Sequence, residues 1–373
     1  MKKKLVIAAV IACLAAALLA ALFLYRMKTR NAVEELSEGK KIINILIAGS
    51  NKYKERKFDF FAVLSINPVN GNIGITFIPP SFKISMGGSD IKRIDEVDFI
   101  YFEKLRRSIY RDVQIQVPFY VQLYATDGER ITDMLEGIDL FYLDQYACAD
   151  FSKQGLNYFD GKKIMKYINN VEENSIYLKY DRIMDILLTL YYNREEKKKF
   201  LTPDFLLKLL NSLQTNLLPQ ELLTLSRFLS NEGELIYSIL PGDLQDNYYV
   251  MDDVTSKMYT KEFLEKLVSG ADEESGAKIK ILNATPIAGL ARKTRNMLNR
   301  DGYNVVEFGT SPYGEMKKSF IVSRKGDQAF VKKISELSGI PTIYYIIDNS
   351  LLYNTLIMIG KDLGTDDGGQ EQD

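Results

Sequence analysis

The chain has 373 residues, of which 46% are hydrophobic and 26% are charged, a composition typical of folded globular proteins. The formal net charge of −1 gives no basic field for nucleic acid, and we expect no nucleic-acid partner. The absence of histidine excludes Ser-His-Asp and Cys-His catalysis as well as histidine metal sites. The two cysteines, Cys13 and Cys148, form no CxxC motif or cluster, so a thiolate zinc site is also excluded.

The N-terminus predicts one membrane-spanning helix. Residues 1–4 are a basic start, and residues 5–25 carry no charge, glycine or proline. A helix of this length crosses the ~30 Å hydrocarbon layer. The segment ends in Leu-Phe-Leu-Tyr-Arg, which favours an uncleaved signal anchor over a cleaved signal peptide or a lipoprotein modified at Cys13. We expect residues 1–4 to be cytoplasmic and the body to be extracytoplasmic, on the periplasmic or cell-wall side.

Residues 26–41 are polar and predict a stalk, and residues 42–268 predict a large mixed α/β domain. Apolar runs and alternating patterns predict strands at 42–48, 60–66, 72–78, 118–124, 138–143 and 234–240. Helical spacing predicts helices at 90–108, 128–136, 160–167, 177–192, 203–213, 220–229 and 260–268. Asp160 is placed to cap the third of these helices. The expected fold is therefore a mixed sheet with surrounding helices.

A second unit follows a linker at residues 269–276 (SGADEESG). The pattern of residues 277–363 is β-α-β-β-α-β-β, which predicts a small α/β sandwich. Its strands are predicted at 278–282, 304–308, 319–323, 343–347 and 355–359, and its helices at 288–301 and 327–337. Residues 364–373 are acidic and predict a disordered tail.

Several stretches together resemble the LytR-CpsA-Psr family of envelope proteins. In the large domain these are NILIAGSN at 44–51, FDFFAVLSINPVNGNIGITFIP at 58–79, NYFDGKKIMKYI at 157–168 and DRIMDILL at 181–188. Residues 278–309 resemble the LytR C-terminal domain. The resemblance implies transfer of a glycopolymer from a polyprenyl pyrophosphate lipid to peptidoglycan. That chemistry requires a divalent cation, arginines around the pyrophosphate and a carboxylate.

The chain departs from the family pattern at most of those positions. Asp59 matches one of the two cation-binding aspartates, but the other position is Asn51, a neutral and weaker ligand. The family's Ile-Pro-Arg-Asp is Ile-Pro-Pro-Ser at 78–81, and residues 167–171 lack both arginines of Tyr-x-Arg-x-Arg. Lys179 and Arg182 are the cations that match the residual phosphate site. No catalytic set is therefore intact.

These departures favour a non-catalytic LytR-CpsA-Psr-like protein that binds or scaffolds a glycan, a lipid-linked sugar or an envelope partner. Its expected partners are the membrane, peptidoglycan, envelope glycan and polyprenyl-linked sugar. The alternative is a weak cation-dependent glycopolymer transferase, which would use Mg²⁺ at Asp59 and Asn51. Two basic runs, 104–111 and 194–199, are further candidates for contact with acidic glycan or lipid phosphate, although solvated helix faces explain them more simply.

Overall fold

The computed structural model describes residues 31–51, 57–142, 155–171, 175–200, 202–228, 233–270 and 276–364. The predicted cytoplasmic start and anchor, residues 271–275 of the linker and residues 365–373 of the tail lie outside the described residues. Among the described helices, none has the length and apolar character needed to cross a membrane.

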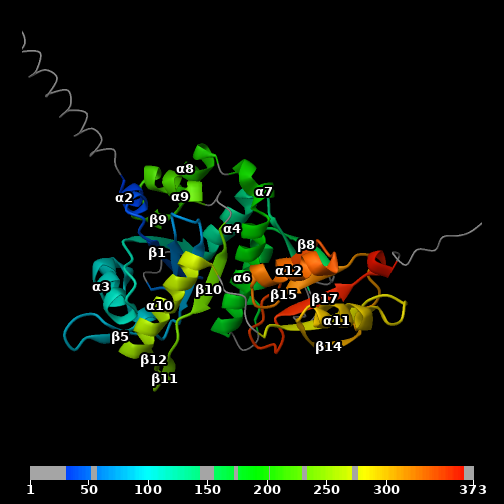
Figure 1. Ribbon diagram of the computed structural model, residues 1–373. Helices are drawn as coiled ribbons and strands as arrows, with labels where there is room; N and C mark the ends of the chain where they lie inside the picture. The colour runs from blue at the N-terminus through cyan, green and yellow to red at the C-terminus, as the bar shows by residue number, and fades with distance from the viewer. Residues whose placement is uncertain are drawn as a thin grey trace, which may run out of the picture.

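A six-stranded mixed sheet forms the centre of the large unit (Figure 1). Its strands lie in the order β10-β3-β2-β1-β6-β9. Its strands are β1 (Ile43–Ser50), β2 (Phe60–Ile66), β3 (Ile73–Ile78), β6 (Phe119–Tyr124), β9 (Gln214–Thr215) and β10 (Leu235–Ile239). β1, β2 and β3 are successive antiparallel neighbours, whereas β6 and β10 run parallel to β1 and β3. All six residues of β3 are buried, because helices cover both faces of the sheet.

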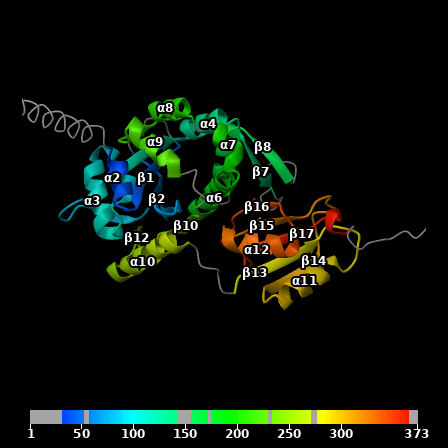
Figure 2. The ribbon, with the colours of Figure 1, turned by 45° about the horizontal axis from the view of Figure 1, so that its top comes forward.

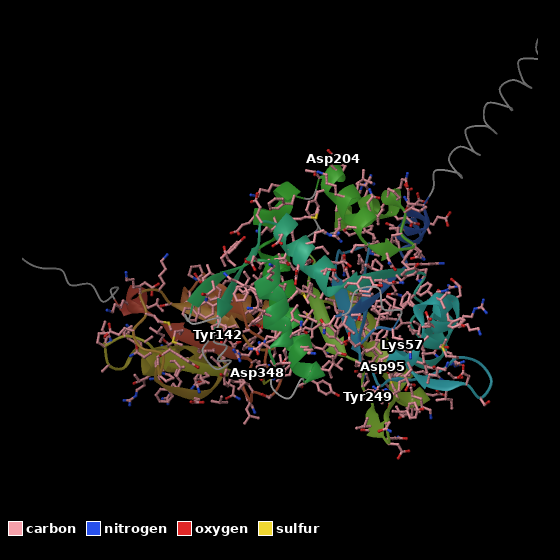
Figure 3. All side chains as sticks on the ribbon, turned by 180° about the vertical axis from the view of Figure 1, so that it is seen from behind. Lys57, Asp95, Tyr142, Asp204, Tyr249 and Asp348 are labelled. Atoms are coloured by element: carbon pink, nitrogen blue, oxygen red, sulfur yellow. The ribbon has the colours of Figure 1, made fainter. Side chains whose placement is uncertain are left out.

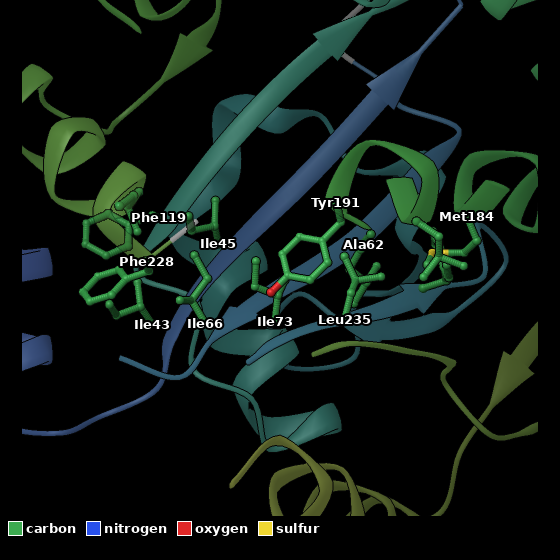
Figure 4. Close-up of a cluster of buried hydrophobic side chains, with 14 of the residues drawn as sticks. Ile43, Ile45, Ala62, Ile66, Ile73, Phe119, Met184, Tyr191, Phe228 and Leu235 are labelled. Atoms are coloured by element: carbon green, nitrogen blue, oxygen red, sulfur yellow. The ribbon is translucent and has the colours of Figure 1, made fainter. Parts of the chain in front are cut away.

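One face of the sheet packs against α2 (Ala32–Glu38), α6 (Ile176–Tyr192), α8 (Pro203–Ser212) and α9 (Pro219–Phe228). Figure 4 shows part of this core, in which strand and helix side chains meet. The opposite face is covered by α3 (Phe102–Val113) and α10 (Asp253–Ser269), which contact each other. On this face Phe263 lies so close to Gly74 that a Cβ there would meet its ring at 2.4 Å.

Two predictions in this unit are wrong in part. The predicted stalk contains α2, whose Val33 is fully buried and whose N-terminus is capped by Asn31, which accepts from the Glu34 amide at 2.7 Å. The helix predicted at 90–108 begins only at Phe102. The preceding residues form β5 (Ile91–Arg93), which pairs with β4 (Lys83–Ser85), and two short 3-10 turns. Strand pairing therefore outweighs the helical spacing there.

The remaining predicted helices and strands are present with small changes at their ends, except that the helix predicted at 260–268 begins seven residues earlier, at Asp253. They are α4 (Ala125–Met134), β7 (Ile138–Tyr142) and α5 (Gly161–Asn169), together with the helices and strands already described. The Asp160 cap is confirmed, since its carboxylate accepts from the Lys163 amide at 2.8 Å. Sequence patterns missed β8 (Gly155–Phe159), which pairs with β7, the short helix α7 (Arg194–Lys197), and the hairpin of β11 (Asp243–Gln245) and β12 (Tyr248–Val250).

The C-terminal unit is built on a five-stranded sheet in the order β14-β13-β17-β15-β16. Its elements are β13 (Lys278–Asn283), α11 (Leu290–Arg300), β14 (Asn304–Thr310), β15 (Phe320–Ser323), α12 (Gln328–Ser338), β16 (Ile343–Tyr345) and β17 (Thr355–Ile359). The predicted α/β order is confirmed. Figure 2 shows this unit beside α6 and the β7–β8 hairpin of the large unit.

Candidate functional site

A cavity of about 460 Å³ lies between the end of β1 and the helices α4, α5 and α6. Most of its wall is aliphatic, formed by Leu123, Ile131, Leu135, Ile138, Ile164, Met165, Ile168, Ile176, Ile183, Ile186, Leu187 and Leu190. Concave sites lined mainly by apolar side chains with few polar groups are the usual form of small-molecule sites. The cavity is therefore the candidate ligand site of this chain.

Helix α6 supplies five of the twelve aliphatic wall residues because its apolar side chains recur every three or four positions. Ile176, Ile183, Ile186, Leu187 and Leu190 all reach the cavity. Such spacing places side chains on one helix face. In most helices that face is packed entirely against a core, whereas here the same side chains pack against core residues and also border the cavity.

Of the polar residues that also line the cavity, we call five the polar set: Ser50, Asn51, Asp59, Asn169 and Lys179. They come from neighbouring element ends, namely the end of β1, the start of β2, the end of α5 and the first turn of α6. The Asp59 amide donates to the Gly49 carbonyl at 3.1 Å, which holds Asp59 beside the end of β1. The Asn51 side-chain amide donates to Asn169 Oδ1 at 3.3 Å.

The structure brings together three of the four predicted site residues. Asn51, Asp59 and Lys179 all line the cavity, although 128 positions separate the first from the last. Lys179 is partly buried, and Asn51 and Asp59 are exposed. The polar set offers one cationic side chain, one carboxylate and two amides to a ligand.

Arg182 does not line the cavity, unlike the other three predicted site residues. Its side chain is 2% exposed, and its guanidinium forms an ion pair with Asp185 at 2.8 Å and a hydrogen bond to Tyr167 Oη at 3.3 Å. Tyr167 in turn donates to Asp185 at 2.5 Å. Burial raises the pKa of Asp185 to about 6, against the opposing effect of the Arg182 cation. The structure therefore gives Arg182 a buried ion pair where the sequence predicted a phosphate contact.

The polar set fits a divalent cation poorly. Mg²⁺ in proteins usually takes one or two carboxylates together with substrate phosphates and water, in near-octahedral geometry. Asp59 is the one carboxylate of the polar set, and the Asn51 amide is already paired with Asn169. Among the described residues, no three or more Cys, Asp or Glu side chains group in a way that could hold a metal ion. We derive no step through a metal.

The two basic runs serve local structure. Lys197 donates to the carbonyls of Leu135 and Gly137, both at 2.9 Å, and so caps the end of α4. Lys199 pairs with Glu136 at 2.9 Å. In the other run Arg111 pairs with the adjacent Asp112 at 2.7 Å and also donates to the Ser85 carbonyl, while Arg106 pairs with Glu103 at 2.7 Å. These partners support the simpler interpretation of both runs.

Sequence reasoning missed Ser50 and Asn169 of the polar set and all of the cavity's aliphatic wall. Ser50 lies in the family-like stretch 44–51, and Asn169 stands at the first arginine position of the family's Tyr-x-Arg-x-Arg, so each lay in a recognised stretch but was not assigned a role. The apolar spacing of α6 was visible, but a packed core produces the same spacing. No signal in one sequence distinguishes a filled interior from a hollow one.

Comparison with known proteins finds a family match for the C-terminal unit and a shared fold for the large unit. Residues 276–362 match the family model LytR_C, described as LytR cell envelope-related transcriptional attenuator, beside the predicted range 277–363. TagT bound to LIIa-WTA is similar in structure, with a TM-score of 0.51 and 17% identity over 62% of this chain and 92% of that chain. The putative transcriptional regulator ywtF from Bacillus subtilis gives 0.50 and 16% over the same shares.

The structure of the LytR-CPS2A-psr family protein YwtF (TagT) with bound octaprenyl pyrophosphate lipid gives a TM-score of 0.47 and 15% identity, again over 62% of this chain and 92% of that chain. No curated protein sequence matches the chain. The large unit thus has the fold of the LytR-CpsA-Psr proteins. The protein combines this fold with a LytR C-terminal domain, as the sequence motifs implied.

Proposed function

We propose that this protein is a membrane-anchored envelope protein that binds a polyprenyl-linked lipid without transferring its glycan. Residues 5–25 form the anchor in this proposal, and the body is extracytoplasmic. The observation that carries the proposal is the aliphatic cavity of about 460 Å³ with Asn51, Asp59 and Lys179 in its lining. TagT, whose fold the large unit shares, binds LIIa-WTA, which supports a lipid-linked glycan as the ligand class.

An isoprenoid chain matches the wall of the cavity chemically. Every wall residue contributed by α6, apart from Lys179, is isoleucine or leucine. Burying one five-carbon unit contributes roughly 4 kcal/mol at ~0.8 kcal/mol per carbon, before the cost of ordering the chain. A few such units are enough for tight binding, so the apolar chain would supply most of the affinity.

The polar set would orient the head group. Lys179 supplies an ammonium group to a phosphate, and the Asn51 and Asn169 amides supply neutral donors. Asp59 repels phosphate charge unless a cation lies between them. Because Arg182 is held in its buried ion pair, Lys179 is the cation that the polar set offers. One cation stabilises the negative charge of a departing pyrophosphate only weakly. The head group is therefore bound and not cleaved.

A decisive test fills the cavity. Ile183→Trp places a large ring into the wall of α6, and Met258→Trp makes the matched change at an exposed position of α10, where the side chain is 58% exposed. We expect the full-length protein in lipid nanodiscs to bind polyprenyl phosphate saturably. Ile183→Trp should abolish this binding and Met258→Trp should leave it unchanged. Equal binding by both variants would refute the proposal.

The alternative function is a weak cation-dependent glycopolymer transferase, and the observation that favours it is the presence of Asp59 in the cavity lining. The two functions separate in a turnover assay with a polyprenyl pyrophosphate-linked glycan, peptidoglycan and Mg²⁺. We expect no turnover by the wild-type protein. Turnover that depends on Mg²⁺ and is lost in Asp59→Ala would establish the transferase.

A further inference from the structure

Helix α6 packs on the sheet core through Tyr180, Met184 and Tyr191, and two further faces of the helix meet the cavity and the C-terminal domain. One face lines the cavity at positions 176, 179, 183, 186, 187 and 190. The other contacts the C-terminal domain through Asp181, Asp185, Leu188 and Tyr192. Since an α-helix turns about 100° per residue, these two sets lie about 180° apart around the helix axis. The C-terminal domain therefore packs directly behind the cavity wall.

The contact behind α6 is built from hydrogen bonds to two buried carboxylates. The Asn349 side-chain amide donates to Asp181 at 2.6 Å, and the Asn349 backbone amide donates to the same carboxylate at 3.3 Å. The Ile347 backbone amide donates to Asp185. Hydrogen bonds to charged groups contribute about 1.5–3 kcal/mol each. The hydrogen bonds from Ile347 and Asn349 therefore stabilise the position of α6 against the C-terminal domain.

Apolar packing reinforces this contact. Tyr345 and Ile347, which are 4% and 0% exposed, belong to the same buried cluster as the core residues of the large unit. Tyr345 stacks on Tyr192 of α6 with ring centroids 5.3 Å apart. Gly326 approaches so closely that an added Cβ would meet the Tyr237 ring at 2.8 Å and the Leu188 side chain at 3.3 Å. The C-terminal domain thus shares a buried core with the large unit.

A second wall of the cavity is held in the same way. In β7, Ile138 lines the cavity, while Phe141 points to the C-terminal sheet. Phe141 stacks on Tyr344 at 4.1 Å and packs against Phe320 at 4.8 Å. Figure 3 places Tyr142 and Asp348 in the region where the two units meet.

We propose that the LytR C-terminal domain positions the walls of the cavity, so that ligand binding in the cavity and the docking of this domain are energetically coupled. The coupling runs through α6 and β7, each of which touches the cavity on one face and the C-terminal domain on the other. By reciprocity, whatever the C-terminal domain binds at this contact would change the affinity of the cavity by the same factor. Asn349 and Gly326 are positioning residues in this account, since neither lines the cavity.

The test uses the full-length protein in nanodiscs and two readouts. Hydrogen exchange of peptides covering residues 176–192 reports on α6 without any ligand, and titration with polyprenyl phosphate reports on the cavity. Asn349→Ala removes the 2.6 Å hydrogen bond, and Gly326→Ala disturbs the separate close contact. Asn304→Ala changes an exposed residue at the outer strand β14 and serves as the matched control.

We expect both contact variants to speed exchange in α6 and to weaken polyprenyl phosphate binding by about 5-fold or more, with no change in Asn304→Ala. Saturating polyprenyl phosphate should slow exchange in residues 343–349 of the wild type. Unchanged exchange in α6, or faster exchange with unchanged affinity, would overturn the coupling. The affinity readout rests on the proposed function. If the wild type binds no polyprenyl phosphate, that function fails, while the exchange of α6 still decides whether the domain positions it.

Discussion

Replacing Lys179 by methionine tests the role of the polar set most specifically. Lys179 lies in the first turn of α6, lines the cavity and is partly buried. Methionine keeps an unbranched apolar stem and removes only the charge. Since no other residue of the polar set is cationic, the substitution should weaken phosphate binding without changing the aliphatic wall.

The size of the effect follows from the position of the ammonium group. A charge-assisted hydrogen bond contributes about 1.5–3 kcal/mol, and the partial exposure of Lys179 places the expected loss at the lower end of that range. A loss of about 1.5 kcal/mol corresponds to roughly a 10-fold rise in Kd. Neutral polyprenol has no charged group that could pair with the Lys179 ammonium, so the Kd for polyprenol should be the same in the wild type and in Lys179→Met.

The assay titrates wild type and Lys179→Met with polyprenyl phosphate and, separately, with polyprenol. Lys179→Arg should retain most of the phosphate affinity, and Lys208→Met, at an exposed position of α8, should have no effect. The reasoning would be refuted if Lys179→Met weakened both ligands equally, since the residue would then act on the shape of the cavity and not on the phosphate.

Three further predictions concern stability. Asp160→Ala removes the N-terminal cap of α5, in which the Asp160 carboxylate accepts a hydrogen bond from the Lys163 amide at 2.8 Å. The substitution should lower the free energy of unfolding by about 1 kcal/mol in urea denaturation. Tyr180→Phe leaves the buried Ile78 carbonyl without its 3.1 Å partner and should cost about 1–3 kcal/mol in the same assay, whereas no loss would show that another group satisfies it. Because the pKa of Asp185 is raised from 3.8 to about 6 on folding, its protonated form is favoured in the native state, and stability is lost as pH rises through this range. Between pH 4 and 7 the wild type should therefore lose on the order of 3 kcal/mol relative to Asp185→Asn, and parallel pH profiles would contradict this.

Local patterns predicted the elements but not every boundary. The strand at 60–66 was predicted at its observed ends, because its apolar run FFAVLSI is followed directly by the turn residues of 67–71. The stalk prediction missed α2 because its short sequence AVEELSE carries a single fully buried residue, Val33, and its stability depends on packing against α9. Tertiary contacts of this kind leave little trace in local composition.

The site was predictable only where the family resemblance supplied positions. That resemblance identified Asn51, Asp59 and Lys179, which the fold does bring to one cavity. It also suggested Arg182, although Asp185 stands three residues later, a helical spacing that favours an ion pair. The docking of the C-terminal domain could not be predicted. Asp181 and Asp185 are spaced four residues apart in the sequence, and this spacing is the same whether the helix face is solvated or buried in a contact.

Identification of the lipid that accompanies the protein tests the central claim most directly. Full-length wild-type, Ile183→Trp and Met258→Trp proteins would be purified from membranes, and their bound lipids extracted and identified by mass spectrometry. We predict a polyprenyl phosphate-linked lipid in near-equal amount to the wild type and to Met258→Trp, and its loss from Ile183→Trp. Bulk phospholipid alone, in equal amounts on all three proteins, would contradict the assignment of the cavity.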